Sequence, residues 1–175
     1  MKLFGVSIGW AFCGYFASVI ATAALLHRLR EMPRFFSLVS LPGTIGHELL
    51  HFLVGTLALA KPVKVSLMPK FHRDGSATLG YVTFSNIRWY NALWVGFAPL
   101  LALPAALMLA YYRSMQIPPL QPLEFVWGYV AASLVYSCLP SKADVEIVLS
   151  KPVGLSVYLG SAAMLCWAWL RLSPQ

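Results

Sequence analysis

Two histidines and a glutamate stand together inside a long apolar segment, as His47-Glu48-Leu49-Leu50-His51. On a helix, positions i and i+4 lie on one face about one turn apart, so His47 and His51 can bind a single metal ion. Glu48 projects beside them, where its carboxylate can take a proton from water and later deliver it to a leaving amine. Ionisable side chains in so apolar a segment are costly without partners. The pattern therefore predicts a catalytic Zn²⁺ site, with His47 and His51 as metal ligands and Glu48 as general base.

A catalytic zinc site takes three protein ligands, so the third must come from elsewhere in the chain. Asp144 is the preferred candidate, because it follows Pro140, which ends the helix before it. Aspartate is also a good N-cap residue, so Asp144 has a purely structural interpretation as well. Glu146 is the alternative ligand, and is otherwise a first-turn acid that favours the helix dipole. We expect no metal contact from the remaining candidates, His27, His72 and Cys138.

The composition indicates a membrane protein. The 175 residues are 59% hydrophobic and 11% charged, whereas soluble domains carry about 25% charged residues. The apolar stretches are typical of membrane-spanning helices. They cover roughly residues 3–26, 35–60, 89–112, 125–139 and 153–170. We predict one domain over residues 1–175, an all-α membrane bundle of about five transmembrane helices in a multi-pass protein.

The connection between the second and third predicted helices has a different pattern. Residues 61–88 alternate polar and apolar side chains on both sides of Asp74-Gly75, which is typical of a β-hairpin. An isolated hairpin is marginally stable in water. We therefore expect it to lean on the helices or to dip into the membrane surface.

The net charge of +7 would suggest nucleic acid as the partner of a soluble protein. Here cations that anchor helix ends at the headgroups of a lipid bilayer are the preferred interpretation, and no nucleic-acid partner is predicted. The cluster His27-Arg28-Leu29-Arg30 favours a retained first span over a cleaved signal peptide. The positive-inside rule places the N-terminus and the hairpin in the cytoplasm, in a plasma or inner membrane.

Several motifs around these residues resemble the site-2 protease family of intramembrane zinc metalloproteases, in a small form without a PDZ domain. They are the run from Pro42 to His51, then Gly96-Phe97-Ala98-Pro99, then Pro140-Ser141 and Asp144, so the resemblance covers about residues 40–148. It implies that Asp144 completes the zinc site and that the hairpin receives substrate as an added strand. The strand that would bind substrate comprises Leu79, Gly80, Tyr81, Val82, Thr83, Phe84 and Ser85.

These observations predict an enzyme that hydrolyses peptide bonds of membrane-spanning or membrane-anchored polypeptides. Two other functions remain open: a membrane metal-binding or assembly protein without turnover, and a metallohydrolase that acts on a lipid. In a metal-binding or assembly protein without turnover, Glu48→Gln leaves function intact while His47→Ala abolishes it. In either hydrolase, both changes abolish activity and Glu48→Gln retains zinc.

Overall fold

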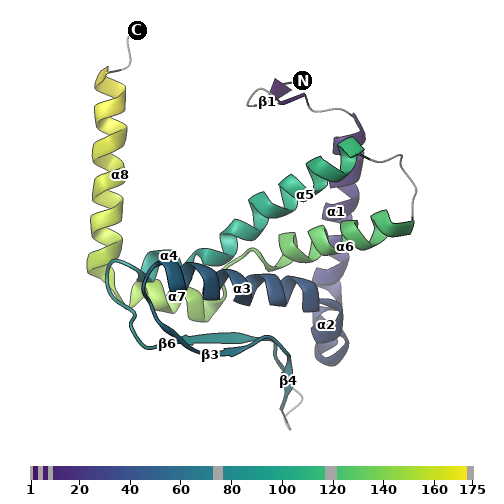
Figure 1. The fold of residues 1–175 in the computed structure, drawn as a ribbon, viewed down its shortest axis with the longest axis horizontal. Helices are drawn as coiled ribbons and strands as arrows, with labels where there is room; N and C mark the ends of the chain where they lie inside the picture. The colour runs from purple at the N-terminus through teal and green to yellow at the C-terminus, as the bar shows by residue number, and fades with distance from the viewer. Residues whose placement is uncertain (1, 4–5, 8–9, 73–76, 117–121, 173–175) are drawn as a thin grey trace.

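The computed structural model describes residues 2–3, 6–7, 10–72, 77–116 and 122–172, and most of these are helical (Figure 1). The helices are α1 (Trp10–Arg28), α2 (Pro33–Val39), α3 (Leu41–Leu57), α4 (Ala92–Gly96), α5 (Ala102–Gln116), α6 (Pro122–Ser137), α7 (Lys142–Leu149) and α8 (Pro152–Leu172), with 3-10 turns η1 (Leu29–Glu31) and η2 (Ala98–Leu101). Three short antiparallel pairs join β1 (Lys2–Leu3) to β2 (Val6–Ser7), β3 (Pro62–Ser66) to β6 (Tyr81–Phe84), and β4 (Lys70–Phe71) to β5 (Ala77–Thr78).

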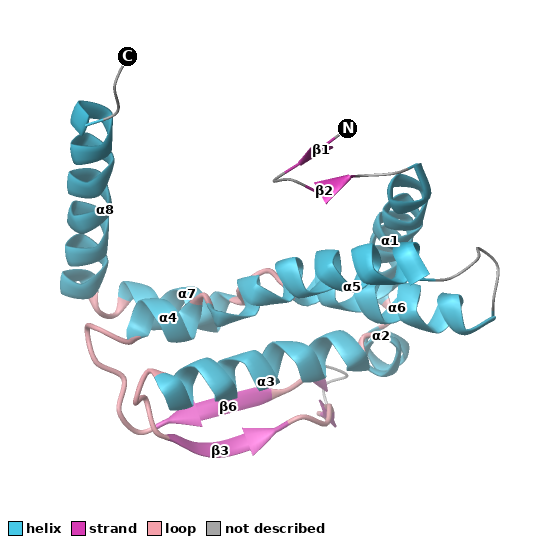
Figure 2. Ribbon diagram, turned by 45° about the horizontal axis from the view of Figure 1, so that its top comes forward, coloured by secondary structure: helices cyan, strands magenta, loops and turns pink. Residues whose placement is uncertain are grey.

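Helix α3 lies at the centre of the molecule, between the β3–β6 sheet on one side and helices α4 to α7 on the other (Figure 2). Helix α1 crosses the far end of this arrangement and packs on α5 and α6. The core there is built from small side chains: Val19 and Ala23 of α1 meet Ala131 and Ala132 of α6. Small residues let helix backbones approach closely.

The prediction of about five transmembrane helices is wrong. Within the described residues, only Pro152–Arg171 is a helix long and apolar enough to cross a membrane, with a mean hydropathy of 1.5. Helices α6 and α7 would make a second span only if the pair, bent by 42°, were counted as one. The described residues therefore contain one candidate membrane span and not the predicted multi-pass arrangement.

Breaks inside the apolar segments explain the difference. The segment 35–60 divides at Ser40, and Pro42 stands in the first turn of α3, a position that proline favours. The segment 89–112 divides into α4, η2 and α5, with Pro99 at the start of η2. The resulting helices α3 and α5 have 17 and 15 residues, fewer than the roughly 20 that a span needs.

The alternating segment after α3 forms antiparallel strands that lie along this helix. Strand β6 pairs with β3 in a register that sets Tyr81 opposite Ser66 and Val82 opposite Val65. The side chain of Asn91, which is fully buried, donates hydrogen bonds to the carbonyl groups of Ala58 and Asn86 and so ties both ends of the hairpin segment together. The predicted turn at residues 74–75 lies outside the described residues.

The contact between α3 and α6 depends on Gly43. A Cβ atom at this position would overlap the backbone carbonyl group of Ser133. We expect Gly43→Ala to lower the free energy of unfolding by about 1–3 kcal/mol, because backbone atoms cannot move aside as a flexible side chain can. Gly14→Ala is the matched control, since a Cβ on Gly14 of α1 meets nothing within 4 Å. Gly14→Ala should raise the free energy of unfolding by about 0.5–1 kcal/mol, because alanine is more stable than glycine inside a helix. Thermal unfolding in detergent measures both, and an unchanged Gly43→Ala protein would contradict this packing.

Candidate metal centre

One face of α3 carries the polar residues of the predicted site. Thr44, His47, Glu48 and His51 recur at intervals of three or four residues and line a single cavity. This spacing puts side chains on the same side of a helix. Both imidazoles therefore lie on one side of α3, as their spacing in the sequence predicts.

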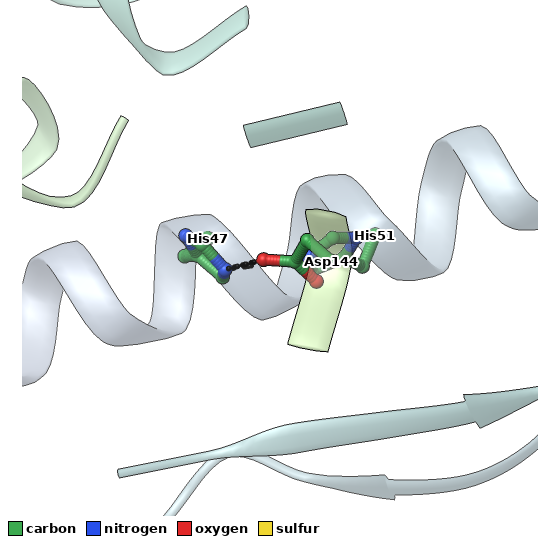
Figure 3. A group of neighbouring side chains, drawn as sticks. All are labelled: His47, His51 and Asp144. Carbon is green, nitrogen blue, oxygen red and sulfur yellow. Dashed lines mark hydrogen bonds and ion pairs between the residues drawn. The ribbon is translucent and has the colours of Figure 1, made fainter. Parts of the chain in front are cut away.

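The structure brings together three of the residues that the sequence predicts to bind metal (Figure 3). The Nε2 atoms of His47 and His51 are 3.2 Å apart. The Asp144 carboxylate lies against both, with Oδ2 at 3.4 Å from His47 Nε2 and Oδ1 at 2.9 Å from His51 Nε2. One ligand atom from each residue falls within 4.8 Å of the others, so the group could hold a metal ion.

Backbone carbonyl groups of two other helices orient the imidazoles. Nδ1 of His47 is 2.8 Å from the carbonyl oxygen of Ser137, where α6 ends. Nδ1 of His51 is 2.9 Å from the carbonyl oxygen of Val95 in α4. Because a carbonyl oxygen only accepts, both Nδ1 atoms must carry the proton. In the neutral ring, each Nε2 then keeps its lone pair for a metal, as metal-binding histidines commonly do.

This donor set fits a divalent cation. With both Nδ1–H groups donating to carbonyl oxygens, two Nε2 lone pairs and a carboxylate converge on one point. Three acceptors this close repel one another unless a cation or an added proton lies between them. His51 and Asp144 are buried, and His47 is nearly so. Burial raises the cost of leaving such groups uncompensated, so the fit favours a bound ion.

Asp144 has a structural role in addition to facing the histidines. The N-cap of α7 is Ser141, and Asp144 is the third residue of the helix, so the N-cap position considered for Asp144 is wrong. The Ser141 backbone N–H donates to Asp144 Oδ2 at 2.7 Å, and the Asp144 N–H donates to Ser141 Oγ at 3.3 Å. This capping box holds the carboxylate in place. A Ser-x-x-Asp pattern before an apolar run is the sequence signal for this capping box, which we did not predict.

The other candidate ligands lie elsewhere. Glu146 points to solvent and sits 3.9 Å from Lys142, its partner one turn away. His72 is exposed and hydrogen-bonds Thr78 at 2.8 Å. His27 packs against the Tyr136 ring, and Cys138 is buried, and neither belongs to the group that could hold a metal.

Glu48 is buried beside the histidines and in contact with the hairpin. Its side chain is 8% exposed. A Cβ on Gly80 would lie 2.7 Å from Glu48 Cγ and 3.2 Å from Oε1, so the absence of a side chain at Gly80 makes room for the carboxylate. Burial raises the pKa of Glu48, while the neighbouring His47 and His51 act in the opposite direction.

The predicted metal ligands and much of the predicted substrate strand line the same cavity, which has a volume of about 880 Å³. Of the predicted strand, Leu79, Gly80, Tyr81, Val82 and Phe84 line it. Thr83 and Ser85 instead hydrogen-bond backbone carbonyl groups of the neighbouring segment, at Lys64 and Lys61. The cavity volume is in the range of small-molecule and peptide sites.

No family model, curated protein or solved structure matches this chain. The arrangement itself provides a group that could hold a metal, a buried carboxylate beside it, and a cavity lined by one strand of a hairpin.

Proposed function

We propose that this protein is a zinc metallopeptidase of the site-2 protease type, which hydrolyses peptide bonds of membrane-anchored polypeptides. The observation that carries the proposal is the convergence of His47, His51 and Asp144, with Glu48 buried beside them on one cavity. Two histidines and a carboxylate are a ligand set that catalytic zinc uses, with one position left for water or substrate.

Bound zinc would polarise the scissile carbonyl and lower the pKa of the attacking water. The chain's own residues would supply the proton transfer. Glu48 lies one residue from His47 on α3, and its carboxylate lies against Gly80, which lines the same cavity. From there it would take the proton of the attacking water at a carboxylate oxygen and deliver it to the leaving amine. The carbonyl groups of Ser137 and Val95 would hold the two imidazoles in the required tautomer.

Strand β6 would bind the substrate backbone. Among the described strands, β6 pairs only with β3, which leaves its other edge unpaired. Tyr81, Val82 and Phe84 of β6 line the cavity that holds the metal group, as do Leu79 and Gly80 just before the strand. An extended peptide could pair with this edge, and its carbonyl groups would be accessible as they are not in a helix. Backbone hydrogen bonds would then provide affinity with little dependence on side chains.

Replacing Gly80, the residue just before β6, with alanine tests the contact between the hairpin and the general base. The added Cβ would meet Glu48 Cγ at 2.7 Å and the Ser66 carbonyl oxygen at 3.0 Å. Either Glu48 or the strand must shift, and a displacement of about 1 Å costs on the order of 10²-fold in rate. We expect kcat to fall by about that factor while zinc content stays unchanged. Full activity in Gly80→Ala would show that the position of Glu48 in the structure is not the one used for hydrolysis.

Helix α8 would anchor the enzyme in the bilayer. Beyond its N-terminal turns, which contact α4 and α7, it projects away from the other helices (Figure 1), and only 6% of its apolar window is buried. Its 20-residue apolar stretch is about 30 Å long, which matches the hydrocarbon core of a membrane. Lys151 precedes the helix and Arg171 lies in its last turn, as flanking cations do at membrane interfaces.

Hydrolysis by the purified, zinc-loaded protein tests the proposal. A panel of peptides with one apolar span and an extended flanking segment is compared with phospholipid vesicles, and new amines and released fatty acids are both measured. Zinc-dependent cleavage of peptides supports the proposal. Cleavage of lipid alone would favour a lipid hydrolase, and zinc binding without any turnover would favour a metal-binding or assembly protein.

A further inference from the structure

The cavity extends well beyond the metal group, along α3 toward α1. Ser40, just before the first residue of α3, and His51 both line it. At about 1.5 Å of rise per residue, these two residues are about 16 Å apart along the helix axis. The wall at the far end comes from α1 and η1, through residues that include Ile20, His27 and Arg30.

This far end differs chemically from the rest of the cavity. His27 and Arg30 line it, and within the part of the chain that the structure describes neither has a carboxylate within 4.0 Å. Ser40 is 4% exposed, and its hydroxyl has no hydrogen-bond partner among the described residues. Two exposed donor-bearing side chains, His27 and Arg30, and the buried, unpartnered Ser40 hydroxyl therefore line the same cavity. A buried hydroxyl without a partner costs free energy, which a ligand that bonds to it would recover.

The direction of β6 indicates which end of a bound peptide would reach this place. Gly80 lies against Glu48, and the Phe84 ring lies against Gly55, so β6 runs toward the C-terminal end of α3. A strand added antiparallel to β6 would run the opposite way. Its C-terminal side would therefore point toward Arg30.

We propose that Arg30, with His27 and Ser40, forms a subsite for a carboxylate on the C-terminal side of the cleaved bond. The inference rests on the proposed function, because it assumes that an extended peptide lies in the cavity. The three donors suit a carboxylate, which accepts several hydrogen bonds at once. An extended chain advances about 3.3 Å per residue, so the carboxylate stands about three to five residues from the bond that is cut.

A binding experiment tests this subsite without hydrolysis. Zinc-loaded Glu48→Gln protein is titrated with fluorescent apolar peptides in two matched pairs. The first pair ends in a free carboxylate or in an amide, and the second pair ends in an amide that follows Asp or Asn. The Glu48→Gln protein with Arg30, His27 and Ser40 unchanged is expected to prefer a carboxylate by about tenfold, as a charge-assisted hydrogen bond provides. Preference for the free terminus identifies a terminal carboxylate as the ligand, and preference for Asp over Asn identifies an acidic side chain.

Arg28 provides a matched control, because it is a neighbouring exposed arginine that does not line the cavity. Arg30→Gln should remove the preference for a carboxylate, while Arg28→Gln should keep it. Ser40→Ala should reduce the preference without removing it. Equal binding of acid and amide peptides, equal effects of Arg30→Gln and Arg28→Gln, or no peptide binding would overturn the subsite. Cleavage of acid and amide peptides at equal rates would contradict the subsite and still support the proposed function. Selective binding of acid peptides without cleavage by the wild type would support the subsite and contradict the proposed function.

Discussion

Glu48→Gln is expected to abolish peptide hydrolysis while the protein keeps its zinc. Glutamine has the shape of glutamate and can occupy the same space against Gly80, but it cannot accept a proton at neutral pH. Loss of a general base lowers kcat by about 10²–10⁴-fold. The metal group consists of His47, His51 and Asp144, so zinc content should not change. Single-turnover cleavage of a span peptide and metal analysis of the same sample measure both quantities.

Glu146→Gln is the control for this substitution, because it removes a carboxylate that is exposed and lies outside the metal group. It should leave both rate and zinc content at the wild-type level. If Glu48→Gln were as active as the wild type, Glu48 would not be the base. If it lost its zinc, the carboxylate would act in metal binding and not in proton transfer.

Asp144→Asn is expected to lose zinc. Asparagine can still accept a hydrogen bond from Ser141, so much of the helix cap survives. The negative charge that faces His47 and His51 does not survive. Substitution of residues that only support a ligand weakens metal affinity by about 10–100-fold, so the loss of a ligand should weaken it by more than about 100-fold. Competition with a zinc chelator measures the change, and hydrolysis should fall in parallel.

Ser141→Ala separates the two roles of Asp144. It removes the hydroxyl that accepts the Asp144 N–H and leaves the carboxylate in place. Loss of an N-cap costs about 1 kcal/mol of stability. The protein should therefore unfold at a lower temperature, while its zinc affinity stays close to that of the wild type. Zinc loss in Ser141→Ala equal to that in Asp144→Asn would mean that Asp144 acts through the helix cap alone.

The two histidines of the group that could hold a metal could be predicted from the sequence because their spacing is local. His47 and His51 are one helical turn apart, and any helix over this segment puts them on one face. Asp144 was preferred over Glu146 as the third ligand, and the structure places Asp144 in the group and Glu146 in solvent. The roles of zinc and of Glu48 in catalysis remain predictions.

The arrangement of the apolar segments could not be predicted in the same way. Hydropathy records how apolar a segment is, but Pro42 and Pro99 determine where the helices divide. The groups that orient the histidines are backbone carbonyls of Ser137 and Val95. Every residue type has a backbone carbonyl, so the residue types at these positions do not identify them as the partners. The far end of the cavity depends on how α1 crosses the other helices, which no local pattern specifies.

X-ray absorption at the zinc edge, on the purified protein loaded with one equivalent of zinc, tests the central claim most directly. We predict two imidazole nitrogens and oxygen ligands at about 2.0–2.2 Å, and loss of the imidazole signal when His47→Ala and His51→Ala are combined. A sulfur shell at about 2.3 Å, or zinc that shows no imidazole ligand, would contradict it.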